Sequence, residues 1–320
     1  MVKVADRQLS YTSSSRENVW FMIKCFLFMG SLFIWFNIIE PEYLYGYNAS
    51  LIDKVDRLES IDDPKIVLIG NSNLVFGMNS ELLEREIGMP VVNMGLHAGL
   101  GNAFHEEMAK LNVAEGDIYI ICHSDYNDNG TIGNAELAWI TIENHFSLWR
   151  LISHKDILSM IRAFPVYLRK SIDLYTSFEG NIDAGGRYSR SGFNEYGDCN
   201  IYREGSVWTK IDPVGCPGVS EECVERLNAL NFYLSQKGAT LLIAGYPIGN
   251  GEVTDDKKLF EDFQRELEEG VDCQVISDFT DYMYDYSYFY DYNFLHLNTE
   301  GARIRSEQLI KDLRKWGGLN

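Results

Sequence analysis

Short apolar runs alternate with segments of helical periodicity along residues 64–316. Continuously apolar runs of this length are typical of strands that are buried on both faces of a parallel sheet. The segments between them end at helix stop signals such as Lys237-Gly238. We therefore predict an α/β domain with three α/β/α layers around a flavodoxin-like, five-stranded parallel sheet. The expected strands are residues 65–70, 90–95, 117–122, 239–244 and 273–277, and the expected helices are 80–87, 102–111, 220–236, 255–269 and 299–316.

One long stretch interrupts the alternation after the third strand. Residues 125–219 contain helical segments at about 133–176 and then a loop rich in Gly, Tyr and Arg. Loops that follow strands of a parallel sheet lie at the edge where sites form. The pattern therefore favours an insertion that acts as a cap or substrate platform in the same domain.

The N-terminal region contains the most apolar segment of the chain. Residues 19–39 read VWFMIKCFLFMGSLFIWFNII, which is long enough to cross a bilayer. Basic residues precede this run and acidic residues follow it, which predicts a cytoplasmic N-terminus and an extracytoplasmic catalytic domain. No small-x-small cleavage site follows this run, which argues against a cleaved signal peptide. A buried core helix is the remaining alternative. The predicted parts are a cytoplasmic tail (1–18), a transmembrane anchor (19–39), a juxtamembrane linker with a short helix (40–63) and a catalytic domain (64–320).

Composition excludes some functions. The chain has 28 basic and 47 acidic residues and a net charge of −19, which repels nucleic acid. No CxxC pair or Cys/His cluster occurs among the six cysteines, so we expect no structural zinc site. Asp281, Asp285 and Asp291 lack the compact ligand spacing of a calcium site, so we expect no other metal, and we expect no cofactor. A disulfide among Cys199, Cys216 and Cys223 and a fully reduced state are both compatible with the sequence.

Three segments carry candidate chemistry at the carboxyl edge of the predicted sheet. Gly70-Asn71-Ser72-Asn73 follows the first strand, where a glycine permits a sharp turn and a serine needs a base to become nucleophilic. Gly95 follows the second strand and would place a free N–H beside Ser72, as an oxyanion donor. His296 precedes the last helix and returns to the same edge, where Asp291 would orient its ring.

The order of these segments resembles the SGNH (GDSL-like) hydrolase superfamily. The matching sequences are GNSN at 70–73, NMGLHAGLG at 93–101, and HLN before the final helix. The similarity is greatest to the membrane-anchored bacterial branch related to alginate-acetylation and teichoic-acid D-alanylation proteins, and residues 188–198 also look like that branch. The resemblance implies Ser72 as nucleophile, His296 as base, and the N–H groups of Ser72 and Gly95 as oxyanion donors.

Three positions depart from the superfamily pattern. Asn71 stands where an acidic residue is usual, as in several acyl-transfer relatives. Asn293 stands three residues before the histidine, at the usual place of the acid, so Asp291 is our candidate and a Ser-His dyad helped by Asn293 is the alternative. The oxyanion asparagine of the third block would be Asn127, although the related branch often has an acidic and aromatic pair here, matching Asp125 and Tyr126.

The remaining candidates concern substrate. Arg187 and Arg190, among aromatic residues, would grip an anionic or sugar substrate, with Tyr126 as a further candidate, and a packed loop is the alternative. His97 and His123 are expected to have structural roles near the site, and His105 is expected on a helix surface.

The sequence predicts a membrane-anchored serine esterase or O-acyltransferase that acts on cell-surface polysaccharide, with acetyl as the expected acyl group. The resemblance implies a multipass membrane O-acyltransferase as partner. The alternative is a non-catalytic glycan-binding or assembly protein of a polysaccharide export system.

Overall fold

The computed structural model describes residues 15–38, 43–143, 145–178, 182–205, 218–249, 257–291 and 295–319, with the backbone alone for residues 15, 32–38 and 146. The chain divides into two compact units, Met1–Glu42 and Tyr43–Asn320. The first unit contains helix α1 (Ser15–Ile38), whose apolar side chains between Val19 and Met29 are largely exposed. In the part of the chain described here, no helix is both long and apolar enough to cross a membrane. For the anchor expected at 19–39, the side chains of residues 32–38 and the whole of residue 39 lie outside the described residues.

The second unit is built on a five-stranded, fully parallel sheet in the order β2-β1-β3-β4-β6. This confirms the predicted α/β class and parallel sheet, and the strand order is the flavodoxin-like one. Every side chain of the three central apolar runs is buried except the first residue of β4, which explains why these runs read as continuously apolar. The strands are β1 (Ile66–Ile69), β2 (Val91–Asn93), β3 (Ile118–Ile121), β4 (Thr240–Ile243) and β6 (Gln274–Val275).

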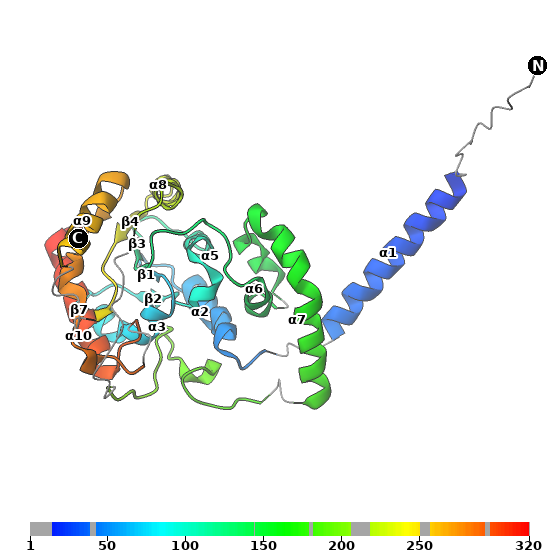
Figure 1. Ribbon diagram of the computed structural model, residues 1–320, viewed down its shortest axis with the longest axis horizontal. Coiled ribbons are helices and arrows are strands. Elements are labelled where there is room, and N and C mark those ends of the chain that lie inside the picture. The colour runs from blue at the N-terminus through cyan, green and yellow to red at the C-terminus, as the bar shows by residue number, and fades with distance from the viewer. Residues whose placement is uncertain are drawn as a thin grey trace, which may run out of the picture. The chain divides into compact units, whose positions relative to one another are not determined.

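Helices cover both faces of the sheet (Figure 1). Ile66 and Leu68 share a core with α3 (Ser72–Gly77), α4 (Ser80–Ile87) and α10 (Thr299–Trp316). Because side chains alternate along a strand, Val67 and Ile69 point to the opposite face. Helices α5 (Asn102–Met108) and α8 (Glu221–Ser235) pack on β1 and β4 there. The other elements are η1 (Tyr47–Ala49), α2 (Ser50–Ser60), η2 (Ala98–Leu100) and α9 (Lys257–Gly270).

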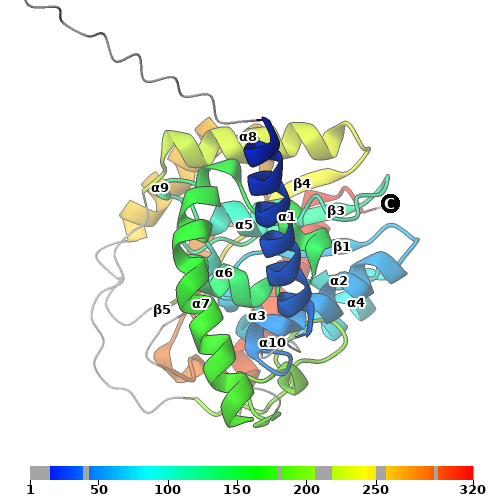
Figure 2. The ribbon, with the colours of Figure 1, turned by 90° about the vertical axis from the view of Figure 1, so that its right-hand side faces the viewer.

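The insertion after β3 is a helical pair followed by a long loop. Helices α6 (Ala135–Thr141) and α7 (Ile157–Ser177) lie side by side (Figure 2), joined by η3 (Phe146–Leu151) and η4 (His154–Asp156). The segment after α6 also binds Tyr43, the first residue of the second unit, whose N–H donates to Glu143 Oε2 at 3.2 Å. Glu143 Oε1 in turn accepts from the Tyr167 hydroxyl at 2.7 Å.

The loop after α7 returns to the sheet. Its turn η5 (Arg190–Gly192) is followed by Tyr196, whose carbonyl accepts the Asn93 N–H at 2.8 Å, and by Cys199, whose N–H donates to Val75 at 2.8 Å. The insertion therefore contacts the ends of β2 and α3.

A small second sheet was not anticipated from the sequence. The Tyr-rich run at 282–292 contributes η7 (Tyr286–Tyr288) and β7 (Met283–Tyr284), which pairs with β5 (Ile248–Gly249) and follows η6 (Phe279–Tyr282). Cys199 and Cys223 are free thiols, and Cys216 lies outside the described residues.

His105 is a correction. It was expected on a helix surface, but its side chain is fully buried on α5, and neither ring nitrogen has a hydrogen-bond partner among the described residues. Burial, and to a smaller extent the neighbouring His123, lowers the pKa of His105 from 6.5 to about 3. The helical spacing of the sequence misled here because α5 lies between the sheet and the insertion and is covered on both sides.

This burial predicts acid lability. The unfolded chain takes up the His105 proton near pH 6.5 and the folded protein only near pH 3, so stability is lost as the pH falls through this window. The loss should reach about 3 kcal/mol by pH 4. Urea unfolding of wild type and His105→Gln at pH 7 and pH 4 should show a smaller drop in the variant. Equal drops in the two proteins would contradict the prediction.

Candidate functional site

The turn after β1 places Ser72 at the carboxyl edge of the sheet. Gly70 is required because a Cβ there would lie 2.9 Å from the Cys122 carbonyl oxygen. Asn71 then caps α3, since its Oδ1 accepts the Asn73 N–H at 2.9 Å. Its Nδ2 donates to Ser124 Oγ at 2.8 Å, which connects the turn to the loop after β3. Asn71, which stands where an acidic residue is usual, thus both caps α3 and donates a hydrogen bond to Ser124.

The structure brings Ser72, His296 and Asp291 into one hydrogen-bonded chain. Ser72 Oγ lies 2.8 Å from His296 Nε2, and His296 Nδ1 lies 2.7 Å from Asp291 Oδ2. An ionised carboxylate only accepts, so the network assigns the proton of the neutral ring to Nδ1. Nε2 is then free to accept the Ser72 hydroxyl proton. Asn293, the alternative acid position, lies outside the described residues.

Aromatic rings fix the His296 imidazole. Its centroid lies 4.7 Å from that of Phe76 and 5.8 Å from that of Tyr290, which is stacked on it at an interplanar angle of 13°. The ring is buried, whereas Ser72 and Asp291 are partly exposed. The base is thus held in one orientation while the nucleophile stays accessible.

Two buried arginines that the sequence did not single out hold the site together. Arg203, in the loop of the insertion, donates to the carbonyl of Leu297, next to His296, at 3.1 Å and to that of Phe76 at 3.0 Å. Arg305 of α10 donates to the carbonyl of Asn73 at 2.8 Å and to that of Gly245 at 3.2 Å. Both therefore connect α3 with the C-terminal segment that carries the base. In the sequence they read as ordinary charged residues, because the carbonyls that they bind come from distant segments.

The predicted oxyanion donors differ in their surroundings. The Ser72 N–H has no acceptor among the described residues. The Gly95 N–H, expected to be free, donates instead to Asn93 Oδ1 at 2.9 Å, because the Asn93 side chain folds back over the turn. Asn127 is exposed; its N–H donates to Asp125 Oδ1 at 2.9 Å, and no described contact joins it to Ser72 or His296. Of the three predicted donors, the Ser72 N–H is therefore the one that is free to bind an oxyanion in this conformation.

A buried polar network supports the end of β2. Asn93 Nδ2 donates to Asp198 Oδ1 at 2.7 Å and to the Leu74 carbonyl at 3.0 Å. Lys54 Nζ donates to the carbonyl oxygens of Asn93 at 2.8 Å and Gly197 at 2.6 Å. Burial outweighs the opposing charge of Asp198 and lowers the pKa of Lys54 to about 7. Burial likewise raises the pKa of Asp198 above its usual value.

The histidines near the site have separate roles. His97 Nδ1 accepts the Gly99 N–H at 2.9 Å, and its pKa is lowered by partial burial and by His296. His123 is buried and its Nε2 lies 3.2 Å from Glu106 Oε1, within an ion-pair network with Arg226. Among the described residues, no group of three or more His, Cys, Asp or Glu side chains is arranged to hold a metal ion.

The three residues expected to contact substrate, Arg187, Arg190 and Tyr126, lie in different environments. The Arg187 guanidinium lies 5.1 Å from the centroid of the Tyr290 ring that stacks on His296, so this cation is beside the site. Arg190 instead forms a two-pronged ion pair with Asp53, at 2.6 and 2.7 Å, which gives it a structural role. Tyr126 is fully buried between His123 and Phe263, because the segment after β3 pairs with Val219 and packs into the core, so its side chain is not available to a substrate.

Tyr188 was not singled out for substrate, yet it is 59% exposed beside the site. Its hydroxyl lies 3.1 Å from that of Tyr290. The aromatic residues of this loop therefore line the approach to His296 on the side of Arg187.

The crowding around Gly95 predicts the effect of a single methyl group. A Cβ at Gly95 would lie 2.8 Å from Leu74 Cβ, 2.9 Å from Asn93 Oδ1 and 3.0 Å from the Asn71 carbonyl oxygen. Gly95→Ala should therefore lower the free energy of unfolding by about 1–3 kcal/mol. Gly218→Ala, whose nearest contacts are 3.6–3.8 Å away, is the control and should change it by less than about 0.5 kcal/mol. Equal unfolding midpoints in urea for the two variants would refute this packing.

No family model matches this chain, and neither does any curated protein or solved structure.

Proposed function

We propose that the protein is a serine esterase or O-acyltransferase, with Ser72 as nucleophile, His296 as general base and Asp291 as the orienting acid. One observation carries the proposal, namely the continuous chain of hydrogen bonds from Asp291 through His296 to Ser72. A nucleophile, a base within hydrogen-bond reach and a third group that orients the base form the minimal unit for acyl transfer. The strand order and the order of motifs also support an SGNH-type fold.

The geometry supports a two-step reaction. As Ser72 Oγ bonds to the ester carbonyl carbon, His296 Nε2 takes the hydroxyl proton and Asp291 stabilises the imidazolium. The tetrahedral intermediate then breaks its bond to the alcohol oxygen, which leaves with the proton from His296. An acyl-Ser72 ester remains. Water or a glycan hydroxyl then attacks this ester and gives its proton to His296. The bond between the acyl carbon and Ser72 Oγ breaks, Ser72 Oγ takes the proton back from His296, and the acyl group leaves as an acid or as a new ester.

The oxyanion needs donors in that intermediate. The Ser72 N–H has no other acceptor in the described structure and would supply the first hydrogen bond. The Gly95 N–H would supply a second only after exchanging Asn93 Oδ1 for the oxyanion. Acyl transfer with two donors would thus involve an adjustment of the buried Asn93 amide at the end of β2.

The substrate proposal is a cell-surface polysaccharide, with acetyl as the acyl group and a multipass membrane O-acyltransferase as partner. Tyr188 and Tyr290 present aromatic surface beside the base, which suits the apolar faces of sugar rings. The resemblance of residues 70–73, 93–101 and 296–298 to the SGNH polysaccharide branch supports the same choice.

A second function is favoured by the occupied Gly95 N–H. If Asn93 keeps this donor, the oxyanion has one backbone donor instead of two, and loss of one such donor costs about 10²–10³ in rate. The protein would then bind glycan at the same edge without efficient turnover, as an assembly protein. The kinetic experiment below separates the two functions.

Turnover of an activated acetyl ester such as p-nitrophenyl acetate tests the triad. Ser72→Ala should abolish turnover, and Asp291→Asn should lower kcat by roughly 10³-fold or more, because the imidazolium loses its carboxylate. Asn293→Ala and the remote control Ser235→Ala should stay near wild type. All four should unfold within a few degrees of wild type. Small and equal losses for Asp291→Asn and Asn293→Ala would contradict the triad and favour a dyad.

We further propose that residues 19–39 anchor the protein in a membrane with the catalytic unit outside the cytoplasm. Support comes from the length and apolarity of this segment, the basic residues before it and the exposed apolar side chains of α1, such as Phe21 and Phe26.

Fractionation tests this location. The full chain should stay in the membrane pellet after alkaline carbonate and high salt, because an apolar helix, unlike a surface charge contact, resists both. A chain lacking residues 1–42 should be released. Release of the full chain by either wash would contradict the anchor.

A further inference from the structure

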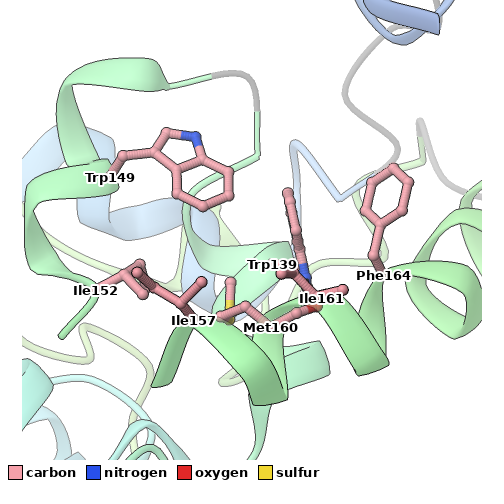
Figure 3. Close-up of a pocket in the computed structure, with 7 residues that line it drawn as sticks. All are labelled: Trp139, Trp149, Ile152, Ile157, Met160, Ile161 and Phe164. Atoms are coloured by element: carbon pink, nitrogen blue, oxygen red, sulfur yellow. The ribbon is translucent and has the colours of Figure 1, made fainter. Parts of the chain in front are cut away.

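The helical insertion contains an apolar cavity that the catalytic proposal does not use. It has a volume of about 450 Å³ and lies between η3 and α7. Trp149 stands opposite the Ile157–Phe164 side of α7, with Trp139 between them (Figure 3). The Trp139 Nε1–H is already satisfied by the Met160 carbonyl at 2.8 Å, so the cavity offers hydrocarbon surface almost alone. A hydrocarbon chain is the ligand that such a lining fits.

The apolar surface continues outside the cavity. Ile157, Leu158 and Ile161 are 52%, 56% and 62% exposed. At about 100° per residue, these three side chains lie within one sector of about 100° around α7. Branched side chains of this size are rarely left in water together, and a contiguous exposed apolar patch marks a contact surface.

The charge of residues 145–170 indicates what this apolar surface contacts. The whole chain has a net charge of −19, yet residues 145–170 have five basic side chains and one carboxylate, Asp156, for a net charge of +4. Asp156 is buried and accepts the Ile132 N–H at 3.0 Å, so it does not contribute to this surface. Exposed partners neutralise part of the charge: Lys155 contacts Glu222, Lys170 contacts Glu136 and Arg169 contacts Asp173. Arg150 and Arg162 form no ion pair with any described residue.

We propose that this face of η3 and α7 docks on an anionic lipid bilayer, with the apolar stripe at the level of the acyl chains and the cavity around one of them. An amphipathic helix with Trp and branched apolar residues beside Arg and Lys is the pattern that binds in the interface of anionic membranes. Most of this acidic chain would be repelled by negatively charged headgroups, whereas Arg150 and Arg162 of η3 and α7 would be attracted to them.

Hydrogen exchange of the full chain on vesicles tests the docking face. Backbone amides of residues 147–170 should exchange more slowly on vesicles that contain phosphatidylglycerol than on pure phosphatidylcholine. The double variant Ile157→Ser/Ile161→Ser should reduce the docked population by about tenfold or more per residue. Arg150→Gln/Arg162→Gln should reduce it by about fivefold per residue.

Phe232→Ser/Leu259→Ser is the matched control, since these side chains are 66% and 48% exposed elsewhere on the unit. It should behave as wild type. Equal exchange with and without anionic lipid, or protection that appears without vesicles as protein concentration rises, would overturn the proposal. If carbonate releases the protein but amides 147–170 are still protected by anionic lipid, only the anchor is rejected. If the protein resists carbonate but these amides are not protected by anionic lipid, only the docking face is rejected.

Discussion

The hydrogen bonds of His296 are the interaction on which the account depends. They connect a serine at the first strand with a carboxylate and an imidazole just before the last helix, at distances of 2.8 and 2.7 Å. A neutral histidine can hold this position only if one nitrogen donates and the other accepts, and Asp291 decides which. Phe76 and Tyr290 contact the ring and also contact each other, so its orientation is restrained before any substrate binds.

Much of the surrounding structure maintains that arrangement. Arg305 and Arg203 each bind carbonyls on α3 and on a segment far from it in the chain, which keeps the nucleophile and the base from drifting apart. Removing such a buried cation would leave several buried carbonyls without donors, which is far more costly than losing a surface charge. The Lys54, Asn93 and Asp198 network does the same for the end of β2, where the Gly95 N–H sits.

The sequence predicted the parts of this structure that local rules control. The five predicted runs became the five strands, and the three central ones are continuously apolar because they are buried on both faces. Gly70, Ser72, Asp291 and His296 were predicted at one edge because parallel strands end on the same side. Features that depend on tertiary packing were predicted wrongly. His105 was expected on a helix surface, Tyr126 in contact with substrate, and the Gly95 N–H without an acceptor. Each depends on which distant segment covers it, as do the roles of Arg203 and Arg305, and periodicity contains no such information.

The most direct test of the central claim is covalent. A fluorophosphonate probe reacts with a serine only when a neighbouring base activates it. Peptide mapping of the folded protein after reaction should find about one equivalent of adduct on Ser72 and none in Ser72→Ala. Folded wild-type protein that acquires no adduct at Ser72 would contradict the account.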